Sequence, residues 1–152
     1  MVRHSIKEQL ILHEGLKLKV YKCPANKWTI GVGRNLEDVG LSKAEQVEIL
    51  GTCGLSRLEV IDVLLEKGIT KEQAMYLLDN DIAKCTADVK QFPWFENLNP
   101  VRQKVIIDMC LNLGFAGLKE FKRMILALEQ GDYETASEEM KDSKWYYQVG
   151  IR

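Results

Sequence analysis

Two hydrophobic periods follow one another in the first part of the chain. Ile6 and Leu10 lie four residues apart, which is helical spacing and predicts a short helix over about residues 6–14. Gly15 is the expected stop signal at the end of that helix. Over residues 16–21, aliphatic side chains alternate with two lysines and Tyr21, which is a period of two residues and predicts a strand.

A second strand is predicted shortly after the first. Pro24 and Asn26 are typical of a turn. Residues 28–32 are rich in β-branched and aromatic side chains, which favour a strand. The two strands therefore form a predicted hairpin. Residues 35–40 are predicted as a loop, with a short third strand as the alternative.

Helical signals dominate the rest of the chain. Residues 42–45 and 70–73 both have the sequence of a capping box, in which two side chains satisfy free amides of the first turn. The second box begins the longest predicted helix, over about residues 71–91, which Phe92 and Pro93 end.

Three more helical segments are predicted after it. Asn99 caps a helix that starts at Pro100, and Gly114 stops it. An amphipathic stretch follows over residues 118–128, and a last helix runs from Asp132 to about residue 141.

A hairpin followed by a run of helices predicts an α+β fold. We expect one domain over residues 1–152. Its hairpin-containing lobe covers about residues 13–70, and residues 71–91 form the connecting helix. Residues 92–152, together with the N-terminal helix, form a larger helical lobe. A cleft between two lobes is a common place for a binding site.

Composition narrows the class of protein. The chain has 152 residues, 46% of them hydrophobic and 28% charged, which is typical of a globular protein with a full core. No apolar run approaches the ~20 residues of a membrane span, and the N-terminus lacks the apolar region of a secretory signal. We therefore expect no membrane insertion and a cytoplasmic location.

Charge and metal-ligating residues exclude further classes. The net charge of −1 argues against a nucleic-acid binder. Residues 14–34 hold five basic and one acidic side chain, a local +4, which we interpret as a solvated strand face rather than a site for an anionic polymer. The four cysteines show no Cys-x-x-Cys spacing, so reduced thiols and no metal site are expected.

Three residues around the predicted hairpin carry candidate chemistry. Glu14 ends a predicted helix, where the macrodipole disfavours its charged form, so it can serve as a general acid. Cys23 is expected at a partly exposed turn with a lowered thiol pKa. Thr29 lies on the return strand. Taken singly, Glu14 is more often a surface glutamate, Cys23 a small buried apolar residue and Thr29 an ordinary strand threonine. Their joint spacing is what indicates a site for a sugar and a water.

This spacing resembles that of the phage-type lysozymes, the endolysin muramidases of tailed phages. Eight residues separate Glu14 from Cys23 and five separate Cys23 from Thr29, as in that family's pattern of Glu, Asp or Cys, and Thr. The resemblance extends over nearly the whole chain. It includes residues 68–74 at the start of the long helix, residues 112–114, and residues 143–148.

The resemblance implies a lysozyme-like fold and hydrolysis of the β-1,4 bond between N-acetylmuramic acid and N-acetylglucosamine in peptidoglycan. It implies that Glu14 is the general acid and that Cys23 and Thr29 hold the attacking water, with inversion at the sugar carbon. No cofactor is implied, and a monomer is expected. Release from the cytoplasm to the cell wall would depend on a separate membrane-permeabilising protein.

Further residues fall at family positions with supporting roles. Arg34 stands where the family often has histidine, and we expect it to pair with Asp81 on the long helix. Arg152 matches an arginine that contacts the catalytic glutamate. The positions that the resemblance assigns to sugar contacts are Asn35, Leu111 and Asn112.

Two departures from the family keep alternatives open. Cysteine replaces the commoner aspartate at residue 23, so we favour a water-positioning or thiolate role over a covalent nucleophile. Relatives usually continue past the position of Arg152, which motivates a peptidoglycan-binding module that does not cleave. A lytic transglycosylase is the other alternative, because it needs a glutamate but no water-holding partner. A purely structural helical protein would leave the spacing unexplained.

Overall fold

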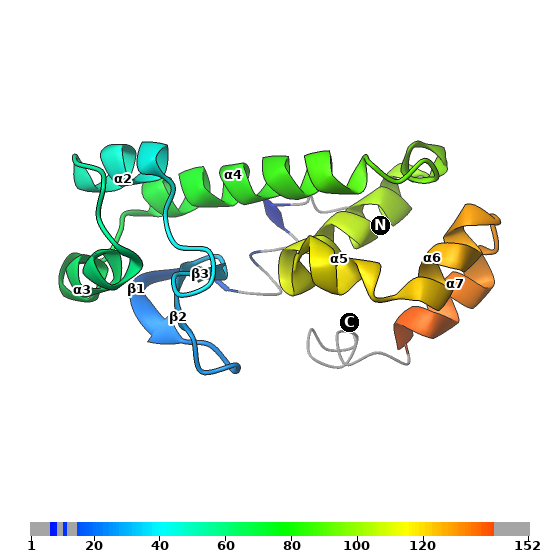
Figure 1. Ribbon diagram of the computed structural model, residues 1–152, viewed down its shortest axis with the longest axis horizontal. Coiled ribbons are helices and arrows are strands. Elements are labelled where there is room, and N and C mark those ends of the chain that lie inside the picture. The colour runs from blue at the N-terminus through cyan, green and yellow to red at the C-terminus, as the bar shows by residue number, and fades with distance from the viewer. Residues whose placement is uncertain (1–6, 9–10, 12–14, 142–152) are drawn as a thin grey trace. The chain divides into compact units, whose positions relative to one another are not determined.

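The computed structural model of the chain describes residues 7–8, 11 and 15–141 (Figure 1). Most of the predicted N-terminal helix and the segment 143–148 lie outside these residues. The chain divides into two compact units, one up to Asn80 and one from Asp81 onward. The predicted boundaries of the hairpin-containing lobe, the connecting helix and the helical lobe stay predictions.

The first unit contains a three-stranded antiparallel sheet in the order β1-β2-β3. Its strands are β1 (Lys17–Lys22), β2 (Trp28–Gly31) and β3 (Arg34–Asn35). Thr29 on the central strand pairs with Tyr21 on one side and with Asn35 on the other. The predicted hairpin is confirmed, and the short third strand, given above as the alternative to a loop, is present.

Two short helices follow the sheet in the first unit, α2 (Lys43–Leu50) and α3 (Arg57–Lys67) (Figure 1). The predicted capping box of α2 is complete: the Glu45 N–H donates to Ser42 at 3.2 Å and the Ser42 N–H donates to Glu45 at 2.9 Å. Ser56 and Glu59 form a second complete box, which the sequence analysis did not single out and which starts α3.

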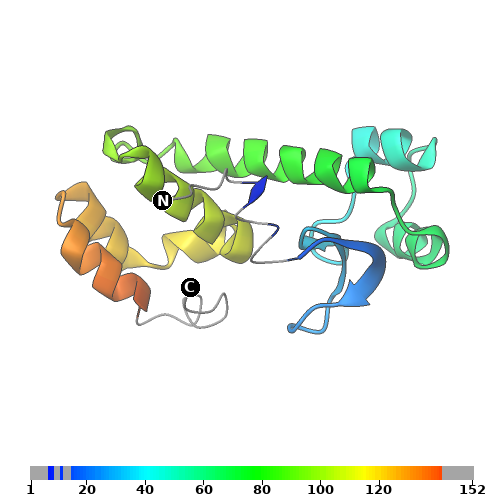
Figure 2. The same ribbon diagram turned by 180° about the vertical axis from the view of Figure 1, so that it is seen from behind.

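The core of the first unit combines residues of the sheet with residues of its helices. Helix α3 packs against β1, and the two lie side by side in Figure 2. The fully buried side chains of this core include Ile30, Leu36, Leu64 and Leu77. Gly68 caps α3 with φ 65°, and a Cβ at this position would lie 2.6 Å from the Leu18 carbonyl oxygen. Only glycine allows the helix end to approach β1 so closely.

The long helix α4 (Lys71–Val89) begins at the predicted capping box. The Gln73 N–H donates to the Thr70 hydroxyl at 3.1 Å, and the Thr70 N–H donates to the Gln73 side chain at 2.9 Å. Ala74 and Leu77, in its first half, belong to the core of the first unit. Val89, its last residue, belongs to the core of the second unit.

The second unit is helical in its described residues. Its elements are η1 (Phe95–Asn97), α5 (Pro100–Lys119), α6 (Lys122–Glu129) and α7 (Tyr133–Lys141). Asn99 caps α5 as predicted, with the Arg102 N–H donating to its side chain at 2.8 Å. Gly114 interrupts α5 with φ 76° and ψ 161°, so the predicted stop is a break between two helical runs.

Sheet and helices together confirm the α+β fold class. The core of the second unit is built from one side of each helix, with Phe95, Ile106, Met109, Leu118 and Met124 almost fully buried. α6 and α7 pack against each other. Among the described residues, no helix has the length and apolar character that a membrane span requires.

Candidate functional site

The turn between β1 and β2 is built by residues 23–27. The Cys23 N–H donates to the Lys27 carbonyl at 3.0 Å, and the Asn26 N–H donates to the Cys23 carbonyl at 2.8 Å. Pro24 occupies the position of the turn that its fixed φ favours. Asn26 takes the left-handed conformation, with φ 63°, which asparagine tolerates better than most residues. The three residues between Cys23 and Lys27 therefore fix where Cys23 lies relative to β2.

Cys23 and Thr29 are brought together by this turn. Thr29 is buried, with 3% of its surface exposed, and Cys23 is half-buried. The Thr29 hydroxyl donates to the Lys27 carbonyl at 2.9 Å, the same carbonyl that accepts the Cys23 N–H at 3.0 Å. Because a hydroxyl has one proton and two lone pairs, a Thr29 that donates to Lys27 keeps its oxygen as an acceptor.

The surroundings of Cys23 favour its thiolate. Burial by itself raises the pKa of Cys23, but hydrogen bonds from the Lys27 and Ala25 backbones lower it, and the net direction is downward. A partly exposed thiol with a lowered pKa is typical of a reactive cysteine. The expectation of a lowered thiol pKa at this turn agrees with the structure.

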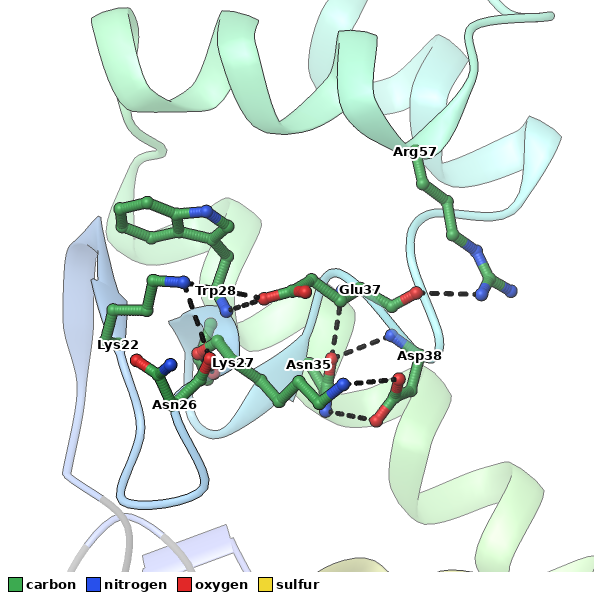
Figure 3. Close-up of polar contacts among 9 residues, drawn as sticks. Lys22, Asn26, Lys27, Trp28, Asn35, Glu37, Asp38 and Arg57 are labelled. Atoms are coloured by element: carbon green, nitrogen blue, oxygen red, sulfur yellow. Dashed lines mark hydrogen bonds and ion pairs between the residues drawn. The ribbon is translucent and has the colours of Figure 1, made fainter.

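Asn35 lies at the end of β3 and orders the loop that follows. Its side-chain oxygen accepts the Glu37 N–H at 2.9 Å and the Asp38 N–H at 2.8 Å, and its amide donates to Asp38 at 3.0 Å (Figure 3). The described contacts of this side chain are therefore local. Its predicted contact with a sugar stays a prediction.

Arg34 is buried and its described ion-pair partner is Glu45. Its Nη1 lies 2.7 Å from Glu45 Oε1 and also donates to the Gly40 carbonyl at 3.0 Å, and its Nη2 donates to the Leu77 carbonyl at 3.3 Å. Asp81 begins the second unit, so its predicted pairing with Arg34 stays a prediction.

Two predicted sugar contacts belong to α5 in the second unit. Leu111 and Asn112 are half-buried. The Asn112 amide donates to the carbonyl and the carboxylate of Asp108, at 2.9 and 3.0 Å, so it is oriented by its own helix. Whether these residues face the hairpin of the first unit stays a prediction.

Glu14 and Arg152 lie outside the described residues. Their predicted roles as general acid and as its arginine partner are therefore carried forward as predictions. Of the three residues proposed for the chemistry, the structure brings together Cys23 and Thr29.

Two carboxylates of the first unit were not identified from the sequence. Glu45 was identified only as part of a capping box, although it also neutralises Arg34. Burial of Arg34 decides this pairing, since a buried cation needs a carboxylate partner, and the sequence did not show that Arg34 is buried. Glu37 was placed in a loop, yet its carboxylate accepts the Trp28 N–H at 2.6 Å.

Comparison with known proteins shows similarity to phage lysozymes. The sequence profile described as phage lysozyme matches residues 12–152. The chain is 28% identical to probable T4-type lysozyme 1 of Dictyostelium discoideum, over 97% of this chain and 88% of that protein. It is 30% identical to an endolysin of Acyrthosiphon pisum secondary endosymbiont phage 1, over 93% of this chain and 81% of that protein.

A longer protein is also similar. The chain is 31% identical to the pre-baseplate central spike protein Gp5 of Enterobacteria phage T4, over 95% of this chain. It spans only 25% of that protein's length. The similarity therefore concerns one part of the spike protein.

Proposed function

This chain belongs to the phage lysozyme family of glycoside hydrolases, and from that premise we propose that it hydrolyses peptidoglycan at the β-1,4 bond between N-acetylmuramic acid and N-acetylglucosamine. The observation on which the proposal rests is the pair of Cys23 and Thr29 at the hairpin turn, which both bond to the Lys27 carbonyl and of which Cys23 has a thiol of lowered pKa. The relatives named lysozyme and endolysin support the same substrate.

In this mechanism the pair holds the attacking water. The Thr29 hydroxyl donates to the Lys27 carbonyl, so its oxygen can accept one proton of a water, and the Cys23 thiolate can accept the other. A water held through both protons directs a lone pair away from the protein. That lone pair is the nucleophile that inversion requires on the face of the sugar opposite the leaving group.

The bond changes balance with Glu14 as the acid. The water oxygen bonds to the anomeric carbon while the bond from that carbon to the bridging oxygen breaks. The bridging oxygen takes the proton of Glu14, and one water proton passes to the Cys23 thiolate. Glu14 is assigned this role by its spacing from Cys23 and Thr29 in the sequence.

Supporting roles follow from the same family pattern. Asn35, Leu111 and Asn112 contact the sugars, and Arg152 contacts Glu14. We infer that the protein acts as a monomer on the host cell wall, after a separate membrane-permeabilising protein gives it access. The endolysin among its relatives supports this setting.

Product analysis of purified peptidoglycan tests the proposal. The wild-type chain should release new reducing ends, and Glu14→Gln should release none. 1,6-anhydro-muramyl ends would identify a lytic transglycosylase instead. Binding to the insoluble wall without released sugar would identify a non-cleaving module. Wild-type rates retained by Glu14→Gln would reject the assignment of the acid.

A further inference from the structure

One peptide group connects Cys23, Thr29 and Glu37. The carbonyl of Lys27 and the N–H of Trp28 belong to the same planar peptide unit. At its oxygen end, this unit accepts the Cys23 N–H at 3.0 Å and the Thr29 hydroxyl at 2.9 Å. At its nitrogen end, the Trp28 N–H donates to Glu37 Oε2 at 2.6 Å.

We propose that Glu37 is a positioning residue for this site, and that its carboxylate fixes the Lys27–Trp28 peptide plane on which Cys23 and Thr29 are both aligned. The contact from a backbone N–H to a carboxylate is charge-assisted, which makes it short and strong. Because the peptide is planar, holding its N–H sets the direction of its carbonyl as well. A rotation of the plane would move the Cys23 and Thr29 hydrogen bonds together.

Glu37 is itself held from three directions, as Figure 3 shows. Its N–H donates to the Asn35 side chain at 2.9 Å, and its carbonyl accepts Arg57 Nη1 at 2.9 Å. Lys22 Nζ lies 3.9 Å from its carboxylate and 4.2 Å from the centre of the Trp28 ring. The loop after β3 therefore presents the carboxylate to β2 from a fixed backbone.

Polarisation adds to positioning. A peptide group whose N–H donates to an anion becomes a better acceptor at its carbonyl, because hydrogen bonds in a chain strengthen one another. The Thr29 proton is then drawn more firmly to Lys27. This leaves the Thr29 oxygen free to act as the acceptor for a water, which is the role given to it above. In that respect the inference rests on the proposed function.

Three variants separate positioning from charge. Glu37→Ala removes the acceptor of the Trp28 N–H, whereas Glu37→Gln keeps an acceptor oxygen and removes only the charge. Asp38→Ala is the matched control. Asp38 lies on the same loop and pairs with the Lys27 ammonium at 3.6 Å, but no described bond joins it to the Lys27–Trp28 peptide.

The readout is the pH profile of Cys23 alkylation in the folded full-length chain, resolved by mass spectrometry of the Cys23 peptide. Glu37→Ala should move the profile to higher pH and slow alkylation at neutral pH by about ten-fold, since each unit of thiol pKa changes the thiolate fraction ten-fold. Glu37→Gln should shift the profile less than Glu37→Ala, because it keeps an acceptor for the Trp28 N–H and loses only the charge, and Asp38→Ala should stay close to the wild type. Equal shifts in the two Glu37 variants, or a shift in Asp38→Ala, would overturn the proposal.

Two further measurements keep the outcome unambiguous. With solubilised peptidoglycan fragments, Glu37→Ala should lower kcat about ten-fold and leave KM unchanged, because the sugar contacts are intact; a wild type without activity would reject the proposed function but not the thiol result. In the wild type, the Trp28 amide should exchange with solvent slowly. Exchange as fast as that of an exposed amide would remove the basis of the proposal even if Glu37→Ala fails to fold.

Discussion

The Arg34 guanidinium and the Glu45 carboxylate form a buried bidentate ion pair in the first unit, which contains the hairpin. The two nitrogen–oxygen distances are 2.7 and 2.9 Å, and the two side chains are only 5% and 6% exposed. Asn80 donates to the same carboxylate at 2.9 Å, as does the Ser42 N–H. The pair thereby links β3, α2 and α4, and it leaves neither charge without a partner.

Removing the negative charge of this pair should destabilise the fold strongly. Glu45→Gln removes the buried carboxylate that both terminal nitrogens of Arg34 contact, and breaking a buried pair from one side costs about 3–5 kcal/mol. Urea unfolding at neutral pH measures the loss in free energy of unfolding. Glu59→Gln is the matched control, because Glu59 occupies the same capping position at the start of α3 but is exposed. Equal losses in both variants would contradict a role beyond capping.

The same pair predicts a loss of stability in acid. Burial alone raises the pKa of Glu45, but hydrogen bonds from Arg34, Asn80 and Ser42 lower it from 4.5 to about 2. A carboxyl with a lower pKa in the folded state stabilises the protein above its unfolded value, and this contribution disappears as the pH falls through the folded value. The difference in Tm between wild type and Glu45→Gln should therefore have its largest value at pH 6 and decrease as the pH falls from about 4.5 to about 2. A difference independent of pH would contradict the assignment.

Cys23→Asp should keep activity and move its acidic limit. If the thiolate holds the water, the wild-type rate falls as the pH drops below the pKa of Cys23, whereas an aspartate stays ionised down to about pH 4. The expected result is that Cys23→Asp outperforms the wild type in mildly acidic buffer. Reducing ends released between pH 5 and 9 provide the measurement.

Cys23→Ala is the control for that comparison, and it should lose most activity at every pH. Equal rates for Cys23→Ala and the wild type would show that the thiol has no part in the reaction.

Gly68→Ala should destabilise the first unit. Gly68 has φ 65° and ψ −161°, a region that only glycine enters easily, and a methyl group there would meet the Leu18 carbonyl oxygen at 2.6 Å. We expect a loss of about 1–3 kcal/mol, measured by thermal unfolding. Gly51→Ala is the control, because Gly51 also has positive φ, 74°, but a Cβ there meets nothing within 4 Å. A larger loss for Gly51→Ala would contradict the argument from close approach.

Local signals made much of the fold predictable from the sequence. Some signals act within a few residues along the chain and so do not depend on the rest of the fold. They include the capping boxes at Ser42 and Thr70 and the glycine at residue 114. Helix α3 was not delimited because Leu58 and Leu65, 75% and 44% exposed, blur the apolar face that helical periodicity relies on. Its own capping box at Ser56 was the signal that could have located it.

Only the part of the candidate site that depends on the sequence spacing of Cys23 and Thr29 was predictable. Cys23 and Thr29 meet because a hairpin brings their positions together, and a hairpin is readable from sequence. The contact of Arg34 with Glu45 was not predicted, because several carboxylates compete for a buried arginine and the folded arrangement decides between them. Glu37 left no signal at all, since its partner is a backbone N–H that every residue but proline possesses.

The four thiols should differ in reactivity in an order set by their surroundings. Hydrogen bonding to Cys110, together with burial, raises the pKa of Cys85, and Cys110 is itself buried. Cys53 is exposed, and the pKa of Cys23 is lowered despite its partial burial. At neutral pH, Cys23 and Cys53 should therefore be alkylated rapidly, and Cys85 and Cys110 only when denaturant unfolds the second unit. Peptide-resolved mass spectrometry across a urea series measures all four sites in one sample, with Cys53 as the exposed reference. Labelling of Cys85 at the rate of Cys53 in the native protein would contradict the packing of the Cys85–Cys110 pair.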